Sequence, residues 1–197
     1  RTYIPLGQIP LVVQQATIAI EDAEFYSHPG FSIRGILRAV ERNLIRGQLA
    51  GGSTITQQLV KNALLTHDRT LQRKLKEVIL AFWTETTFSK DKILEMYLNE
   101  VSYGGTAYGI EEASQLYFDK SARDLTLVEA SLLAGLPAAP TRFSPFGIDP
   151  DLASIRQQLV LARMAEEGFI TIEQARETAQ EELTFAPQKT PIKAPHF

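Results

Sequence analysis

The chain has 197 residues, of which 44% are apolar and 22% are charged, and its formal net charge at pH 7 is −3. This composition is ordinary for a folded protein, and it excludes a disordered tail, a collagen-like rod and a disulfide scaffold. The absence of cysteine excludes thiol catalysis and cysteine-based zinc sites, and no apolar run approaches the roughly 20 residues of a membrane-spanning helix.

Helical periodicity runs through most of the sequence, whereas no convincing alternating strand appears, so an all-α fold is expected. The helices are expected at Leu11–Glu24, from Ser32 to about Gly47, from Ser53, at about Thr70–Phe88 and at Asp91–Asn99. Capping boxes are predicted at Thr126–Glu129 and Thr171–Gln174. Residues 1–184 then read as one domain, and the proline-punctuated segment 185–197 reads as a linker that leaves it.

The cations of the chain gather in its first half, between positions 34 and 76, where only Glu41 and Asp68 oppose them. They are Arg34, Arg38, Arg42, Arg46, Lys61, Arg69, Arg73, Lys74 and Lys76. A basic block in an otherwise acidic chain indicates an anionic ligand: a nucleic acid, a phosphate or a membrane surface.

A first group of chemically active side chains lies near the end of the first expected helix. If the helix continues, Glu21, Phe25 and His28 share one face, while Asp22 is rotated away from it. A carboxylate beside an aromatic ring and an imidazole can have a raised pKa and act as a base. The alternative is an acidic helix end with His28 capping the next turn, and spacing alone favours this alternative.

A second group follows Gly51 and Gly52, which allow the backbone to approach a ligand closely. The helix that begins at Ser53 would offer its free N–H groups to an anion. A polar stripe follows along that helix; its members are Thr54, Gln57, Gln58 and Lys61. A capped amphipathic helix with solvated side chains explains the same pattern equally well.

The third group is Arg73, Lys74 and Glu77, which a helix places within one turn. Together with Lys61, Arg69 and Lys76 these residues form a cationic wall that carries one carboxylate. Such a wall suits a diphosphate better than a nucleic acid, because no extended basic tract is present to follow a duplex. His28, His67 and His196 lack the spacing of metal ligands, so no zinc site is expected.

Taken in order, these segments resemble the peptidoglycan glycosyltransferase domain of class A penicillin-binding proteins, the lysozyme-like glycosyltransferase family 51. The matching motifs are Ile20-Glu21-Asp22-x-x-Phe25-x-x-His28-x-Gly30, Gly52-Ser53-Thr54-Ile55-Thr56-Gln57-Gln58-x-x-Lys61-Asn62, Arg73-Lys74-x-x-Glu77, Lys90-x-x-Ile93-Leu94-Glu95-x-Tyr97-Leu98-Asn99 and Gly104-x-x-Ala107-Tyr108-Gly109-Ile110. The resemblance covers residues 10 to 185. One departure is visible: the family usually has paired arginines in its last motif, whereas Arg156 is followed here by Gln157.

The resemblance implies a lysozyme-like α fold with a large head lobe and a smaller, membrane-facing jaw lobe at roughly 30–68. It also implies polymerisation of lipid II into β-1,4-linked glycan, with inversion and release of undecaprenyl diphosphate. Glu21 would be the general base, and Glu77 the second catalytic carboxylate, which orients the donor diphosphate. The remaining family positions would bind or position substrate; they are Asp22, Phe25, His28, Ser53, Thr54, Gln57, Gln58, Lys61, Arg69, Arg73, Lys74 and Lys76.

The same resemblance implies the surroundings of the domain. A divalent cation, Mg²⁺ or Mn²⁺, is possible near Glu77, and no organic cofactor is expected. Expected partners are lipid II, the growing lipid-linked glycan, moenomycin-type inhibitors, the membrane surface at the extracytoplasmic face of a bacterial cytoplasmic membrane, and a C-terminal transpeptidase domain. Two alternatives are a lytic transglycosylase or muramidase, which has no use for a diphosphate wall, and a non-catalytic module that binds a lipid-linked precursor.

Overall fold

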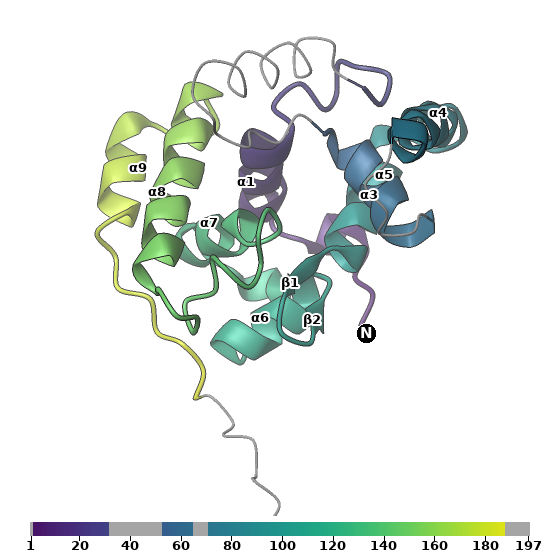
Figure 1. Ribbon diagram of the computed structural model, residues 1–197. Coiled ribbons are helices and arrows are strands. Elements are labelled where there is room, and N and C mark those ends of the chain that lie inside the picture. The colour runs from purple at the N-terminus through teal and green to yellow at the C-terminus, as the bar shows by residue number, and fades with distance from the viewer. Residues whose placement is uncertain (1, 32–52, 65–70, 188–197) are drawn as a thin grey trace, which may run out of the picture.

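The structure, a computed structural model, describes residues 2–31, 53–64 and 71–187 (Figure 1). Its elements are η1 (Leu6–Gln8), α1 (Leu11–Glu21), α3 (Ile55–Leu64), α4 (Leu71–Thr87), α5 (Lys90–Glu100), β1 (Ser102–Gly104), β2 (Ala107–Tyr108), α6 (Ile110–Phe118), η2 (Ala122–Asp124), α7 (Leu127–Gly135), α8 (Asp151–Glu166) and α9 (Ile172–Thr178). The expected all-α, lysozyme-like class is confirmed. Within these residues, no helix has both the length and the apolar character needed to cross a membrane.

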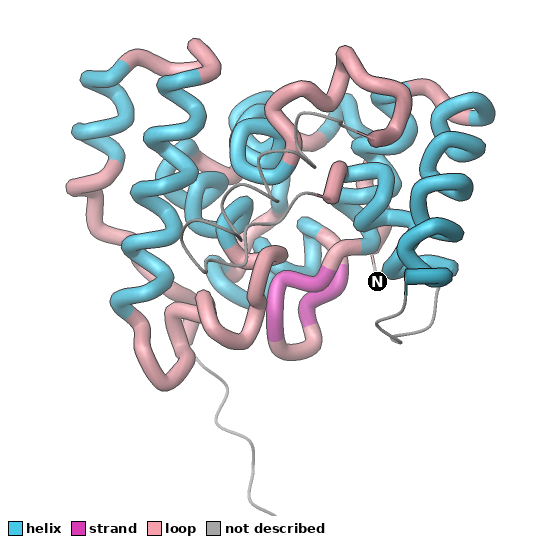
Figure 2. The backbone as a smooth tube through the Cα atoms, turned by 45° about the horizontal axis from the view of Figure 1, so that its top comes forward, coloured by secondary structure: helices cyan, strands magenta, loops and turns pink. Residues whose placement is uncertain are grey.

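Helix α1 lies in the middle of the molecule (Figures 1 and 2). It packs against α7 and α8 on one side, whereas α3 packs against α4 and α5 on the other. The core between these groups includes the fully buried rings of Phe25, Tyr97 and Tyr103. The C-terminus of α1 therefore lies between two helical groups that come from distant parts of the sequence.

One small sheet departs from the sequence-based expectation of helices only. Strands β1 and β2 form an antiparallel hairpin in which Ser102 pairs with Tyr108 and Gly104 with Ala107 (Figure 2). Strands of two or three residues are too short to show the alternation on which a strand prediction rests.

The end of α1 also differs from the expectation, because the helix stops at Glu21 and does not continue to Glu24. Asp22 has φ −163° and ψ 74°, which is outside the helical region. Of the two alternatives for this segment, the one in which Glu21, Phe25 and His28 share a helical face is therefore excluded. The alternative that the spacing favoured, an acidic helix end with His28 capping the next turn, is observed, since Nδ1 of His28 accepts from the N–H of Gly30. The carboxylate of Asp22 accepts hydrogen bonds from His28 and from the backbone N–H of Ile55, and these contacts favour a turn over a further helical turn.

Most other predicted elements are confirmed with small shifts of their ends. The third expected helix begins at Ile55, two residues later than predicted, and the next two span Leu71–Thr87 and Lys90–Glu100. Both predicted capping boxes are present. The helix predicted from Ser32 and most of the jaw lobe at 30–68 lie outside the described residues, as does most of the predicted linker 185–197. The domain bounds stay a prediction.

Candidate active site

Glu21 is the last residue of α1, and its side chain is 8% exposed. One carboxylate oxygen, Oε2, accepts a hydrogen bond of 2.6 Å from Nε2 of Gln58 on α3. The other, Oε1, is buried and lies 3.9 Å from the guanidinium of Arg156 on α8, and it has no hydrogen-bond partner among the described residues. Three helices thus meet at one carboxylate.

The environment of Glu21 favours its neutral form. Burial is the largest cause, and it raises the pKa of this carboxyl above its ordinary value. The hydrogen bond from Gln58 and the positive charges of Arg156 and Lys61 act in the opposite direction, whereas the charge of Asp22 adds to the rise. A carboxylate with a raised pKa is a stronger base once it is ionised, so this environment suits proton abstraction.

The amide of Gln58 is oriented by a second contact. The hydroxyl of Tyr97 donates to Oε1 of Gln58 over 3.2 Å, which leaves the NH₂ group of Gln58 directed at Glu21. Tyr97 is fully buried, and burial raises the pKa of its hydroxyl well above the ordinary value. Tyr97 therefore stays a neutral hydrogen-bond donor at neutral pH.

Arg156 reaches Glu21 because two contacts hold its long side chain. Its Nε donates to the carbonyl oxygen of Gly135 over 3.2 Å, and its guanidinium lies over the ring of Phe143 at 5.3 Å from the centroid. Gly135 is required for this approach, since a Cβ there would lie 2.8 Å from Cγ of Arg156. From the sequence, Arg156 was apparent only as a motif residue, and no role was expected for it.

Gln157, which stands where the family usually has a second arginine, lies elsewhere. It is 6% exposed, and its Nε2 donates to the carbonyl oxygen of Val128 over 2.8 Å and to the hydroxyl of Ser131 over 3.2 Å. These contacts lie between α8 and α7, and neither of them involves Glu21.

Asp22 and His28 form a buried pair beside Glu21. Nε2 of His28 lies 2.9 Å from both carboxylate oxygens of Asp22, and Nδ1 accepts from the backbone N–H of Gly30 over 3.1 Å. Because Nδ1 accepts, Nε2 is the nitrogen that carries the proton and donates to Asp22. Asp22 also accepts from the N–H of Ile55, so this pair joins the end of α1 to the start of α3.

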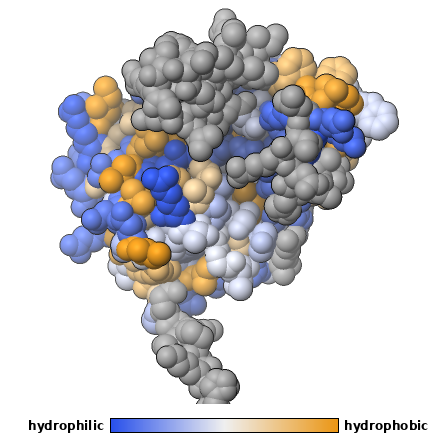
Figure 3. Space-filling view, viewed as in Figure 1, coloured by the Kyte–Doolittle hydropathy of each residue, from blue (hydrophilic) through white to orange (hydrophobic). Residues whose placement is uncertain are grey.

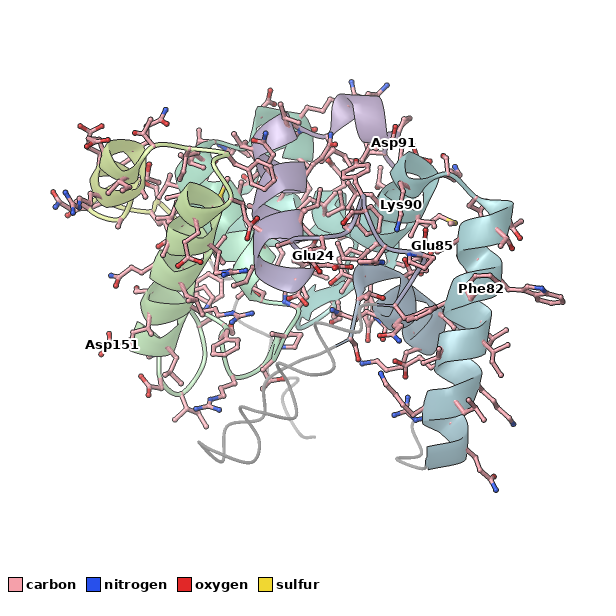
Figure 4. All side chains as sticks on the ribbon, turned by 90° about the horizontal axis from the view of Figure 1, so that it is seen from above. Glu24, Phe82, Glu85, Lys90, Asp91 and Asp151 are labelled. Carbon is pink, nitrogen blue, oxygen red and sulfur yellow. The ribbon has the colours of Figure 1, made fainter. Side chains whose placement is uncertain are left out.

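Lys90, at the start of α5, fixes the same turn from the other side. Its ammonium donates to the carbonyl oxygen of His28 over 2.6 Å and to Glu85 over 2.8 Å, and it lies over the ring of Phe25 at 4.6 Å from the centroid. Figure 4 shows Glu85 on α4 beside Lys90. Phe25 is fully buried and belongs to the core, and its expected role at the substrate stays a prediction.

Thr54 and Gln57 form a capping box at the start of α3. The N–H of Thr54 donates to Oε1 of Gln57 over 3.0 Å, and the N–H of Gln57 donates to the hydroxyl of Thr54 over 3.2 Å. Both side chains are almost completely buried. These two residues therefore cap the helix, and Gln58 is the residue of the stripe that contacts Glu21. Substrate contacts of Thr54 and Gln57 stay a prediction.

Glu77 is the centre of a second cluster, on the inner side of α4. The carboxylate is 2% exposed, and it is held by Arg73 at 3.1 Å on Oε2 and by Lys74 at 2.5 Å on Oε1. The ammonium of Lys74 also donates to the hydroxyl of Ser53 over 2.8 Å. This contact joins α4 to Ser53, which lies two residues before α3. Glu77 and Glu21 are therefore both connected, through Lys74 and through Gln58, to α3 and the residues just before it.

The other predicted cations differ in their placement. Lys61 and Lys76 are exposed, and the charge of Lys61 reaches Glu21, because it lowers the pKa of that carboxyl. Arg69 lies outside the described residues. The structure therefore brings Lys61 to the same region as Glu21, and it places Arg73 and Lys74 around Glu77.

The surroundings of Glu77 do not fit a divalent cation held by protein ligands. Both oxygens of Glu77 already accept from cationic side chains, and a positive ion beside Arg73 and Lys74 would be repelled. Across residues 2–31, 53–64 and 71–187, no three His, Asp or Glu side chains gather as metal ligands. The expected metal near Glu77 thus has no donor set in this part of the chain.

Comparisons with known proteins agree with this arrangement. The model of the transglycosylase family matches residues 1–165. Penicillin-binding protein 1A of Aquifex aeolicus is 49% identical over 185 residues, which are 93% of this chain and 25% of that protein. Penicillin-binding protein 1A of Neisseria lactamica is 45% identical over 186 residues, 94% of this chain and 23% of that protein.

A solved structure shares the fold. The 2.6 Å crystal structure of penicillin-binding protein 1A from Haemophilus influenzae has a TM-score of 0.59 and 23% identity, over 96% of this chain and 19% of that one. The chain thus spans 23–25% of the length of the curated relatives named above.

Proposed function

The chain belongs to the transglycosylase family, and from this premise we propose that it is a peptidoglycan glycosyltransferase that polymerises lipid II into β-1,4-linked glycan strands. The observation that carries the proposal is the pairing of one buried carboxylate of raised pKa, Glu21, with cations on the adjoining helix α3 and on α4. A reaction that removes a proton from a sugar hydroxyl and releases a diphosphate needs both features.

In the proposed step, the 4-hydroxyl of the acceptor sugar attacks the anomeric carbon of the donor. The new bond joins this oxygen to the anomeric carbon, and the bond from that carbon to the diphosphate oxygen breaks with inversion. Glu21 takes the hydroxyl proton, and Oε1 is the oxygen that accepts it, since Gln58 occupies Oε2. The electron pair leaves with undecaprenyl diphosphate.

The leaving diphosphate requires neutralisation of negative charge more than protonation. Lys61 and Lys76 are exposed and can approach it, and Arg69 is proposed for the same task. Glu77 holds Arg73 and Lys74 in place, so we propose that it acts on the diphosphate through these two cations. Ser53, which accepts from Lys74, would fix the position of that ammonium.

The cationic residues also decide between this reaction and its alternatives. A lytic transglycosylase or muramidase cleaves a neutral glycan and has no use for Lys61, Arg73 and Lys74 in this arrangement. A non-catalytic binding module has no need of a buried carboxylate beside them, because ionised Glu21 is costly to bury. Neither alternative uses both the buried carboxylate of Glu21 and the cations on α3 and α4.

The proposal includes the setting of the domain. Lipid II carries its sugars on a membrane lipid, so we place the enzyme at the extracytoplasmic face of a bacterial cytoplasmic membrane, with moenomycin-type phosphoglycolipids as inhibitors. A transpeptidase domain C-terminal to residue 197 is proposed because the penicillin-binding protein 1A relatives are about four times longer than their matched region.

Incubation with fluorescent lipid II, followed by separation of the products by size, tests the proposal. Growth of a ladder of lipid-linked glycans is the expected result. Shortening of preformed glycan with no growth would instead identify a cleaving enzyme, and binding of lipid II without any product would identify a non-catalytic module.

A further inference from the structure

Helix α4 distributes its side chains in an unusual way between its two sides. On the outer side, Ile79, Phe82 and Trp83 are 56%, 47% and 70% exposed, and Figure 3 shows hydrophobic residues gathered over this helix. Its two carboxylates, Glu77 and Glu85, point inward, with side chains 2% and 7% exposed. A helix at the surface normally has the reverse arrangement, and a carboxylate is costly to bury unless it is paired. Both carboxylates are therefore placed for internal partners.

The partners of Glu85 come from the two helices that pack against α4. Its Oε1 accepts a hydrogen bond of 2.5 Å from the hydroxyl of Thr56 on α3 and one of 2.8 Å from the ammonium of Lys90 on α5 (Figure 4). Thr56 is fully buried. The same ammonium donates to the carbonyl oxygen of His28 over 2.6 Å. Glu85 thus connects α3, α4 and α5 to the turn that follows the proposed base.

The end of that turn lies directly on α4 beside Glu85. Gly30 has φ 88°, and a Cβ there would lie 2.8 Å from Cγ of Glu85 and 3.0 Å from the carbonyl oxygen of Ala81. The carbonyl oxygen of Gly30 accepts from the hydroxyl of Thr54 over 2.7 Å. The turn at 22–30 is therefore held on α4 both at His28, through Lys90, and at Gly30.

We propose that Glu85 is a positioning residue for the general base, an inference that rests on the proposed function and deepens it. Glu21 is followed by Asp22, whose carboxylate accepts from Nε2 of His28. His28 is held in turn by the Glu85–Lys90 pair. Glu85 touches no reacting group in this arrangement, and it acts on the base through the turn.

The second carboxylate of α4 explains why the base should be fixed to this helix. Glu77 and Glu85 are eight residues apart, which is about 12 Å along a helix. Glu77 holds the cations assigned to the diphosphate, whereas Glu85 holds the turn beside the base. A single helix thereby sets the distance between these cations and the base. Loss of Glu85 should disturb this distance and leave the cations in place.

Polymerisation of labelled lipid II, with moenomycin affinity measured on the same preparation, tests the role of Glu85. Glu85→Gln should lower kcat about tenfold or more, since a misplacement of about 1 Å can cost about 10²-fold. KM and moenomycin affinity should stay unchanged, because the cations around Glu77 are kept. An unchanged kcat would overturn this inference alone. Absence of polymer from the unmodified chain would overturn the proposed function, and this inference with it.

Glu129→Gln is the matched control. Glu129 is 13% exposed, and it also holds a lysine and a threonine hydroxyl, Lys120 at 2.6 Å and Thr126 at 2.8 Å, but at the start of α7. It should lower the melting temperature as Glu85→Gln does, with kcat unchanged. An equal loss of kcat in both variants would show a general effect of stability and contradict the positioning role.

Variants of Lys90 test the same connection if Glu85→Gln alone is unstable. Glu85→Gln with Lys90→Met leaves neither charge of the pair unpaired, yet it removes the donor to the carbonyl oxygen of His28, so kcat should stay low. Lys90→Arg keeps the charge and the donor, and it should retain most of the rate. Recovery of the original kcat in the double variant would contradict the proposed connection, and so would equal losses in the double variant and Lys90→Arg.

Discussion

The guanidinium of Arg156 lies 3.9 Å from Oε1 of Glu21, and it brings a positive charge from α8 to the carboxylate at the end of α1. Burial lowers the pKa of Arg156 and raises that of Glu21, and their mutual attraction opposes both changes. At this distance the pair is an electrostatic contact and not a hydrogen bond. Oε1 therefore has its charge balanced while it can still accept a proton.

The first prediction concerns the pH dependence of turnover. Because Arg156 favours ionised Glu21, Arg156→Met should raise the pKa of Glu21 further and move the acidic limb of the rate profile to higher pH. Arg156→Lys should move the limb back toward its original position. Arg163→Met is the control on α8, since in the described structure Arg163 pairs only with Glu166 at the end of α8 and with Glu167, which follows it. If the acidic limb of the rate profile stays at the same pH in Arg156→Met, Arg156 does not influence the pKa of Glu21.

The second prediction concerns the stability of Glu21→Gln. The folded pKa of Glu21 is raised, so the fold binds the proton more tightly than the unfolded chain does, and stability is lost as pH rises through the folded pKa. Removing this ionisation should raise the melting temperature at neutral pH. The gain should disappear at a pH below the unfolded pKa, where both states are protonated. Thermal unfolding at two pH values measures it, and a lower melting temperature at neutral pH would be the contrary result.

A third prediction addresses Lys61. It is exposed, and its charge reaches Glu21, so it is placed to meet the leaving diphosphate. Lys61→Ala should lower kcat by about 10²-fold or more, which is the usual loss when one stabilising charge is removed, and Lys61→Arg should retain most of the rate. Lys92→Ala, which removes an exposed cation that pairs with Glu95, should leave the rate unchanged. If Lys61→Ala and Lys61→Arg lower kcat by the same factor, the positive charge of Lys61 does not account for its effect on the rate.

The fourth prediction separates Gln157 from catalysis. Its buried amide holds Val128 and Ser131 at the α7–α8 contact. Gln157→Ala should therefore lower the free energy of unfolding by about 1–2 kcal/mol, with kcat of the folded enzyme unchanged. Chemical denaturation and a rate measurement on the same preparation test both halves. A loss of kcat without a loss of stability would show that Gln157 takes part in catalysis.

Much of the site was predictable from the sequence, because motif order placed Glu21, Gln58, Lys61 and the Arg73–Glu77 segment in one family pattern. The local geometry was less accessible. The helix expected through Glu24 ends at Glu21, because Asp22 makes hydrogen bonds in the turn that a further helical turn would not allow. Helical periodicity carries no information on the contact of Asp22 with the distant Ile55.

Residues that act through distant contacts were the hardest to predict. Tyr97 orients Gln58, and Lys90 holds His28, yet each lies on α5 in an ordinary amphipathic pattern. Thr54 and Gln57 show a different difficulty: polar residues beside a glycine pair suggested ligand contacts, whereas the structure shows that they form a capping box. The spacing of a capping box was present in Thr54-x-x-Gln57 and would have been the better guide.

The most direct test of the account compares polymerisation by the unmodified chain and by Glu21→Gln. Both should bind moenomycin with similar affinity, because the variant keeps the cations and the fold. With labelled lipid II, Glu21→Gln should form no glycan ladder, since the amide cannot take the proton of the acceptor hydroxyl. Ladder formation at a rate near that of the unmodified chain would contradict the central claim that Glu21 is the base.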